Sequence, residues 1–98
     1  MDRIYLDKTN VNNKFQFYQK IQSIINIYLL IIKVEKFEIN KKFRSELYEQ
    51  FIKKNILGIY ITADWIGNNI QIAFSLKSEQ GERNFGNVEI ELNRVMQK

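Results

Sequence analysis

Few side chains in this 98-residue sequence could carry out covalent or acid–base chemistry, because it contains no cysteine and no histidine. Thiolate nucleophiles, disulfides and the commonest zinc ligands are therefore excluded. The serines have no histidine to activate them, and none lies in a G-x-S-x-G motif. The glycines form no phosphate-binding run, and no loop has the spaced acids of a calcium site. We therefore expect no enzyme activity, no cofactor and no metal ion.

One pair of carboxylates, Glu89 and Glu91, lies on a stretch with the pattern of a strand. Side chains two positions apart share one face of a strand, and this face is predicted to be in water. Burial that would separate the two pKa values is therefore not expected. We interpret the pair as acids on an edge strand that discourage further strand pairing.

The stretch "DWIGNNI" contains the single tryptophan of the chain together with an acid, a glycine and two asparagines, a mixture that suits a binding site or a turn. A two-residue turn at Gly67 and Asn68, with glycine first, predicts a type II′ hairpin in which Gly67 has a positive φ. This register places Trp65 opposite Ile70, on the inward face. We expect Trp65 to close the end of the core, and an interface role is the alternative.

A helical repeat of apolar residues begins at Phe15, with steps of three and four residues. It predicts one long helix over about residues 13–37, although the β-branched content leaves residues 27–39 open between helix and strand. The most apolar part, residues 24–32, is nine residues long, against the roughly 20 that cross a bilayer. We therefore interpret it as a core element and expect no membrane partner.

Asn40 is the expected cap of a second helix over residues 41–54, and residues 3–6 are expected to form a short strand. After Asn55 the apolar period changes from 3.6 to 2, which indicates strands. The predicted strands are residues 56–66, 70–76 and 87–93, with a polar loop over residues 77–86 before the last.

These elements predict a single α+β domain over residues 1–98, since this length suffices for one two-layer core. The expected arrangement is a two-layer sandwich, with two N-terminal helices on one face of a three-stranded antiparallel meander, and a four-stranded meander is the alternative. The first ten residues carry charges of both signs and lack the apolar segment of a secretory signal, so we expect a cytoplasmic protein.

Charge is distributed unevenly over the chain, whose formal net charge is +4. Residues 1–55 hold 11 basic and 6 acidic side chains, whereas residues 56–98 hold 4 basic and 5 acidic ones. The basic side chains of the second predicted helix, which could contact nucleic-acid phosphates, are Lys41, Lys42, Arg44, Lys53 and Lys54. Glu46 and Glu49 stand at i, i+4 spacing to two of these lysines and favour a solvated, salt-bridged helix instead.

The outward positions of the predicted sheet form a polar, acidic face. Antiparallel sheets often keep one face in water, and the functional alternative is a docking surface for a basic partner. An aromatic anchor at Tyr60 and carboxylates that steer association would suit that role. The residues of this predicted protein-binding surface are Tyr60, Thr62, Asp64, Gln71, Glu79, Glu82, Glu89 and Glu91.

A small ordered domain without catalytic residues is expected to act by binding another macromolecule. The function we predict is that of a bacterial or phage inhibitor or immunity protein, which binds and neutralises a basic toxin or defence nuclease. A small nucleic-acid-binding protein that uses the second helix is the alternative. The sequence also leaves open a homodimer formed through an edge strand.

Overall fold

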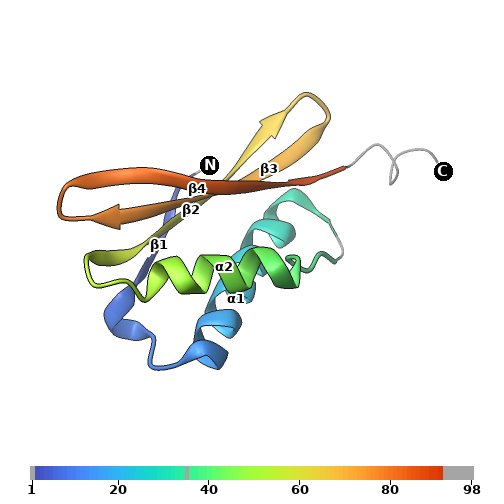
Figure 1. Ribbon diagram of the computed structural model, residues 1–98. Helices are drawn as coiled ribbons and strands as arrows, with labels where there is room; N and C mark the ends of the chain where they lie inside the picture. The colour runs from blue at the N-terminus through green and yellow to red at the C-terminus, as the bar shows by residue number, and fades with distance from the viewer. Residues whose placement is uncertain (1, 35, 92–98) are drawn as a thin grey trace.

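The computed structural model describes residues 2–34 and 36–91, which form two α-helices and a four-stranded antiparallel sheet. In chain order the elements are β1 (Ile4–Asp7), the 3-10 turn η1 (Lys8–Asn10), α1 (Lys14–Ile32), α2 (Lys41–Phe51), β2 (Ile56–Ile66), β3 (Asn69–Ser78) and β4 (Gly81–Ile90). The strand order is β1-β2-β3-β4. Both helices lie on the same side of the sheet (Figure 1). The predicted α+β class and the antiparallel sheet are confirmed, and the sheet has the four strands that were the alternative to three.

Helix α1 is shorter than predicted. The Asn13 side chain accepts a hydrogen bond from the Gln16 backbone N–H at 2.8 Å and caps the first turn. At the other end Lys33 adopts the left-handed conformation, with φ 61° and ψ 41°, and the Val34 N–H donates to the Leu29 carbonyl at 3.0 Å. This is the hydrogen bond of a Schellman motif, which stops the helix five residues before the predicted end. The described residues between 34 and 39 form neither helix nor strand.

Helix α2 begins where the sequence predicts. The Asn40 side chain accepts hydrogen bonds from the backbone N–H groups of Lys42 and Phe43 at 2.9 and 3.2 Å, so the predicted cap is confirmed. The helix ends at Phe51, and residues 52–55 form the turn that leads into β2, so the predicted end at residue 54 is wrong.

The predicted register of the β2–β3 hairpin is confirmed. Ile66 pairs with Asn69, and Trp65 pairs with Ile70. Gly67 has φ 61°, and the only non-glycine residue with positive φ in the described chain lies elsewhere, at the end of α1. Glycine alone therefore has positive φ at this turn, as a type II′ hairpin requires.

Strand β4 begins at Gly81, so the second part of the predicted loop is strand. The first part of β4 is an edge strand, and its consecutive polar residues Glu82, Arg83 and Asn84 are all exposed, so its composition resembles that of a loop. A bulge leaves Phe85 without a partner on β3, and its ring lies 5.2 Å from the ring of Phe43 on α2. Residues 92–93 of the predicted last strand lie outside the described residues.

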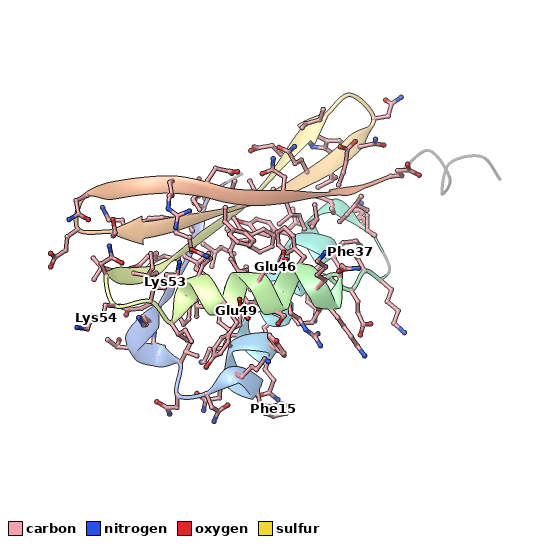
Figure 2. All side chains as sticks on the ribbon, viewed as in Figure 1. Phe15, Phe37, Glu46, Glu49, Lys53 and Lys54 are labelled. Carbon is pink, nitrogen blue, oxygen red and sulfur yellow. The ribbon has the colours of Figure 1, made fainter. Side chains whose placement is uncertain are left out.

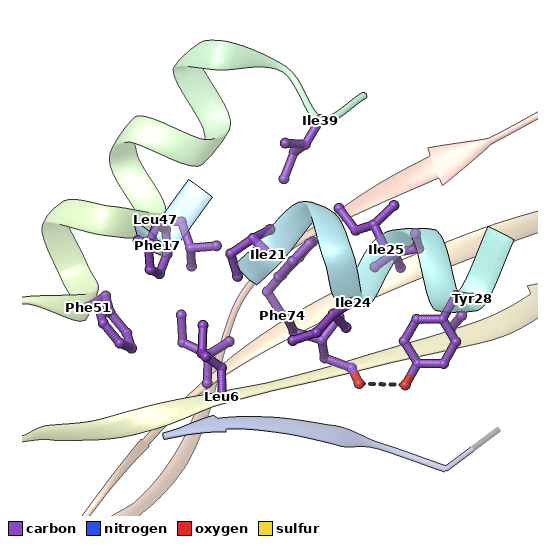
Figure 3. Close-up of a cluster of buried hydrophobic side chains, with 14 of the residues drawn as sticks. Leu6, Phe17, Ile21, Ile24, Ile25, Tyr28, Ile39, Leu47, Phe51 and Phe74 are labelled. Carbon is purple, nitrogen blue, oxygen red and sulfur yellow. Dashed lines mark hydrogen bonds between the residues drawn. The ribbon is translucent and has the colours of Figure 1, made fainter. Parts of the chain in front are cut away.

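The core lies between the two helices and the inward face of the sheet (Figure 3). Phe17 is fully buried, and its ring centroid lies 4.8 Å from that of Phe51 on α2. The hydroxyl of Tyr28 lies 2.8 Å from the Ile61 carbonyl and 2.6 Å from the Asp2 carbonyl, and donates to them. Burial raises the pKa of Tyr28, and its hydrogen bond to Ile61 joins α1 to β2.

Replacing Gly67 by valine should destabilise the fold by about 1 to 2 kcal/mol, because a β-branched residue is strained at this positive φ. No heavy atom lies within 4 Å of the position of an added Cβ, so the effect would come from the backbone and not from a steric clash. Urea denaturation measures the loss. Asn68→Ser, one position along in the same exposed turn, is the matched control. Equal stability of Gly67→Val and the wild type would rule out the turn assignment.

Candidate functional site

The end of the β2–β3 hairpin is the most prominent exposed apolar feature of the sheet. Trp65 is 59% exposed and Ile66 is 45% exposed, whereas Ala63, on the same face as Trp65, is fully buried. The prediction that Trp65 closes the core is therefore wrong. Alternation along a strand determines the face of a side chain, but the helical layer determines whether that face is covered. Here α1 ends five residues early, which removes roughly 7.5 Å of the predicted helical layer.

A row of polar side chains crosses the outward face beside this hairpin end. Asp64 pairs with Gln71 across β2 and β3, and Gln71 pairs with Glu89 across β3 and β4. The side-chain amide of Asn69 donates a 2.8 Å hydrogen bond to the Glu89 carboxylate, which holds that acid over the hairpin. The structure therefore places Asp64 and Glu89 on the outward face of the sheet, on the same side as Ile66, whereas Trp65 lies on the opposite, inward side of the same hairpin end.

An open hollow of about 650 Å³ adjoins the same end of β4. It is lined by Phe37, from the segment between the helices, and by Glu89, Ile90 and Glu91. An aromatic ring beside carboxylates suits a lysine or arginine side chain, which combines an apolar stem with a charged head. Phe37 was not among the predicted site residues, because the predicted first helix extended to residue 37 whereas α1 ends at Ile32.

The predicted aromatic anchor, Tyr60, is half-buried beneath other side chains. The guanidinium of Arg3 lies 3.9 Å from the centre of the Tyr60 ring, and the Tyr5 ring lies 4.7 Å from it on the other strand. Arg3 also forms a 2.6 Å ion pair with Glu82, and this hydrogen bond raises the pKa of Arg3. Tyr60 and Glu82 thus interact within the fold, which makes them poor candidates for contact with a partner.

The eight residues of the predicted surface therefore do not form one patch. Asp64, Gln71, Glu89 and Glu91 lie at the hairpin end, Tyr60 and Thr62 lie further along β2, and Glu79 and Glu82 lie at the β3–β4 turn. The two ends of β3 are roughly 30 Å apart, since a strand rises about 3.3 Å per residue. A partner that contacts the hairpin end would leave the β3–β4 turn at the edge of its footprint.

The basic residues predicted for nucleic-acid binding are also dispersed. Lys41 and Lys42 lie in the first turn of α2, whereas Lys53 and Lys54 follow its end, roughly 18 Å away at 1.5 Å per residue. Arg44 is half-buried, with its guanidinium 4.2 Å from the centre of the Tyr18 ring.

Acids interrupt the same surface. Figure 2 shows Glu46 and Glu49 on α2, which they occupy before the chain reaches Lys53 and Lys54. The predicted i, i+4 ion pairs do not form, since the single ion pair between described residues is that of Arg3 with Glu82. The structure therefore presents these charges as separate solvated groups and not as a continuous basic groove.

Among the described residues, no group of three or more acids lies close enough together to hold a metal ion. Neither helix of the described chain is long and apolar enough to cross a membrane. The fold and the hairpin end define an α+β domain whose hairpin carries an exposed tryptophan on one face and acidic side chains on the other. Comparison with protein families, curated proteins and solved structures gives no match to this chain.

Proposed function

We propose that this chain is a small non-catalytic protein-binding domain, built as a two-layer sandwich that presents the β2–β3 hairpin end to a basic protein. The observation that carries the proposal is the exposure of Trp65 at 59% on the inward side of the hairpin end, while Ile66 and the row that contains Asp64 and Glu89 lie on its outward side. Tryptophan is strongly enriched among interface hot spots. Its burial on association removes a large apolar surface from contact with water.

The acids of the hairpin end select the class of partner. Carboxylates at the same end of the domain as an apolar anchor accelerate association with a positively charged surface and oppose association with a negatively charged one. Nucleases carry basic surfaces because they bind phosphates. A cytoplasmic inhibitor or immunity protein that neutralises a bacterial toxin or a defence nuclease is the function that these features support best.

The test begins with identification of the protein that co-purifies with a tagged wild-type chain from its native host. Trp65→Ala is then expected to weaken binding to that partner by about 2 kcal/mol, a loss of roughly 30-fold, because the apolar anchor is removed. Calorimetric titration measures the affinity. Phe15→Ala, which removes a 69% exposed aromatic side chain from α1, is the matched control and should leave the affinity unchanged.

A charge reversal tests the acidic part of the same surface. The double variant Asp64→Lys and Glu89→Lys should slow association with a basic partner and reverse the dependence on salt. Glu46→Lys with Glu49→Lys makes the same change of charge on α2 and is the control. If both double variants have the same effect, or if Trp65→Ala binds as the wild type does, the hairpin end is not the docking surface.

The alternatives remain predictions with less support. Nucleic-acid binding would use lysines and an arginine that the structure disperses over both ends of α2. A homodimer through the edge strand β4 would have to accommodate its bulge and the charged residues Glu82, Arg83 and Glu89, features that commonly prevent edge pairing.

A further inference from the structure

A small cavity opens between the end of α2 and the β3–β4 turn, at the other end of β3 from the hairpin end. Its volume is about 230 Å³, which is smaller than the roughly 300–1,000 Å³ of sites for drug-sized ligands. The buried side chains of Ile56 and Leu76 supply its apolar lining, and its polar lining includes Lys53, Ser78 and Arg83. A cavity of this size and composition suits one small polar molecule.

Arg83 of β4 lies on the helical side of the sheet at this cavity. It pairs with Leu76 of β3, whose side chain is buried on the same inward face. Its Nη2 group donates a 3.0 Å hydrogen bond to the side-chain oxygen of Gln50 on α2. A guanidinium has five N–H donors, and within residues 2–34 and 36–91 this is its single hydrogen bond. The other donors of Arg83 can therefore bind an anion.

Lys53 lines the cavity from the turn that follows α2, and its backbone is held in place. Its carbonyl accepts hydrogen bonds from the Lys8 ammonium at 2.6 Å and from the Ile56 N–H at 3.2 Å. Its own ammonium forms no ion pair in the described part of the chain. The Asp7 carboxylate beside Lys8 accepts hydrogen bonds from the Thr9 backbone and hydroxyl. Lys8 and Asp7 offset each other in charge, so the positive charge at the cavity comes from Lys53 and Arg83.

The acids at this end of the sheet do not neutralise these two cations. Of the described residues, Glu82 is the one acid in the lining, and its carboxylate forms a 2.6 Å ion pair with the Arg3 guanidinium. Neighbouring residues of a strand point to opposite faces, so Arg83 lies on the helical side and the ion pair on the outward side. Glu79, in the β3–β4 turn, and Glu49, on α2, are outside the lining, and neither forms an ion pair with a described residue. The charge of the lining, with Arg3 included, is therefore positive.

We propose that this cavity binds a phosphate dianion, either free or as the phosphomonoester of a small molecule. The Arg83 guanidinium supplies a fork of N–H donors and Lys53 supplies a point charge from a second element. The Ser78 hydroxyl is a third donor, since its hydrogen bonds to Gln80 and to the Gly81 carbonyl are long, at 3.5 and 3.4 Å. A tetrahedral phosphate accepts hydrogen bonds from several directions, whereas a planar carboxylate is matched by the guanidinium alone. The site is independent of the proposed protein-binding surface.

Titration of the full chain, followed by the amide signals of its NMR spectrum, tests the proposal with glycerol 3-phosphate and with inorganic phosphate. The pH is kept more than one unit above the second phosphate pKa of about 6, so that the ligands are dianions, and the ionic strength is held constant. Saturable shifts are expected at the amides of Lys53, Ser78 and Arg83. Tighter binding of glycerol 3-phosphate would assign the site to a phosphomonoester, and otherwise the free anion is the ligand. Acetate is expected to bind more weakly than either.

Two variants and a matched control separate this site from general attraction of anions. Arg83→Gln and Lys53→Gln should each weaken binding by about tenfold, the loss expected for one hydrogen bond to a charged group. Lys54→Gln removes the same charge from the next residue, which does not line the cavity, and should bind as the wild type does. Thermal unfolding checks that all three variants fold. Absence of saturable shifts, equal losses in Lys53→Gln and Lys54→Gln, or acetate binding as tight as that of phosphate would overturn the proposal.

Discussion

Replacing Phe17 by alanine should lower the free energy of unfolding by about 3 to 5 kcal/mol, the range observed for truncation of a fully buried aromatic side chain. The ring contacts Phe51 and Tyr48 of α2, with centroids 4.8 and 5.1 Å away, so its removal leaves a cavity at the junction of both helices and the sheet. Because these neighbours are themselves held by the core, the cavity should collapse only in part.

Phe15→Ala provides the matched comparison, since it makes the same chemical change two residues away on the same helix. Phe15 is 69% exposed, and its truncation should change stability by no more than about 0.5 kcal/mol. Urea denaturation of both variants, followed by circular dichroism, measures the difference. Comparable losses in the two variants would mean that α1 is rotated relative to the sheet from the orientation described here.

Replacing Gly58 by valine should destabilise the domain by about 3 kcal/mol, at the upper end of the range for overpacked sites. A Cβ atom at this position would meet the ring of Tyr5 and the backbone carbonyl of Leu6 on the neighbouring strand β1. A side-chain ring can rotate away, but the carbonyl is held by the pairing of β1 with β2. The substitution should therefore separate β1 from the sheet.

Two further variants distinguish this steric origin from a general effect of substitution in β2. Leu57→Val alters the adjacent residue, which is 42% exposed, and should have little effect. Adding Tyr5→Ala to Gly58→Val removes the contact with the ring and leaves the contact with the carbonyl, so it should restore only part of the stability. Full recovery in this double variant would show that the ring, and not the strand backbone, limits the space.

Features that depend on local chain geometry could be predicted from the sequence alone. Asn40 caps α2, and Gly67 turns the β2–β3 hairpin in the expected register, because side-chain capping and positive φ depend on a few adjacent residues. The switch of the apolar period from 3.6 to 2 likewise indicated helices followed by antiparallel strands, since it reflects the geometry of each element and not its neighbours.

The tertiary structure alone decided where those elements end and which apolar faces they leave exposed. Lys33 adopts a left-handed conformation that no residue preference predicts, and it stops α1 while the apolar repeat continues. Trp65 is exposed although its parity is inward, and Leu30 is exposed, on the side of α1 away from the core, although it lies within the most apolar stretch of the chain. Periodicity records which side chains share a face, whereas burial requires a second layer long enough to cover that face, and the extent of that layer depends on contacts between distant parts of the chain.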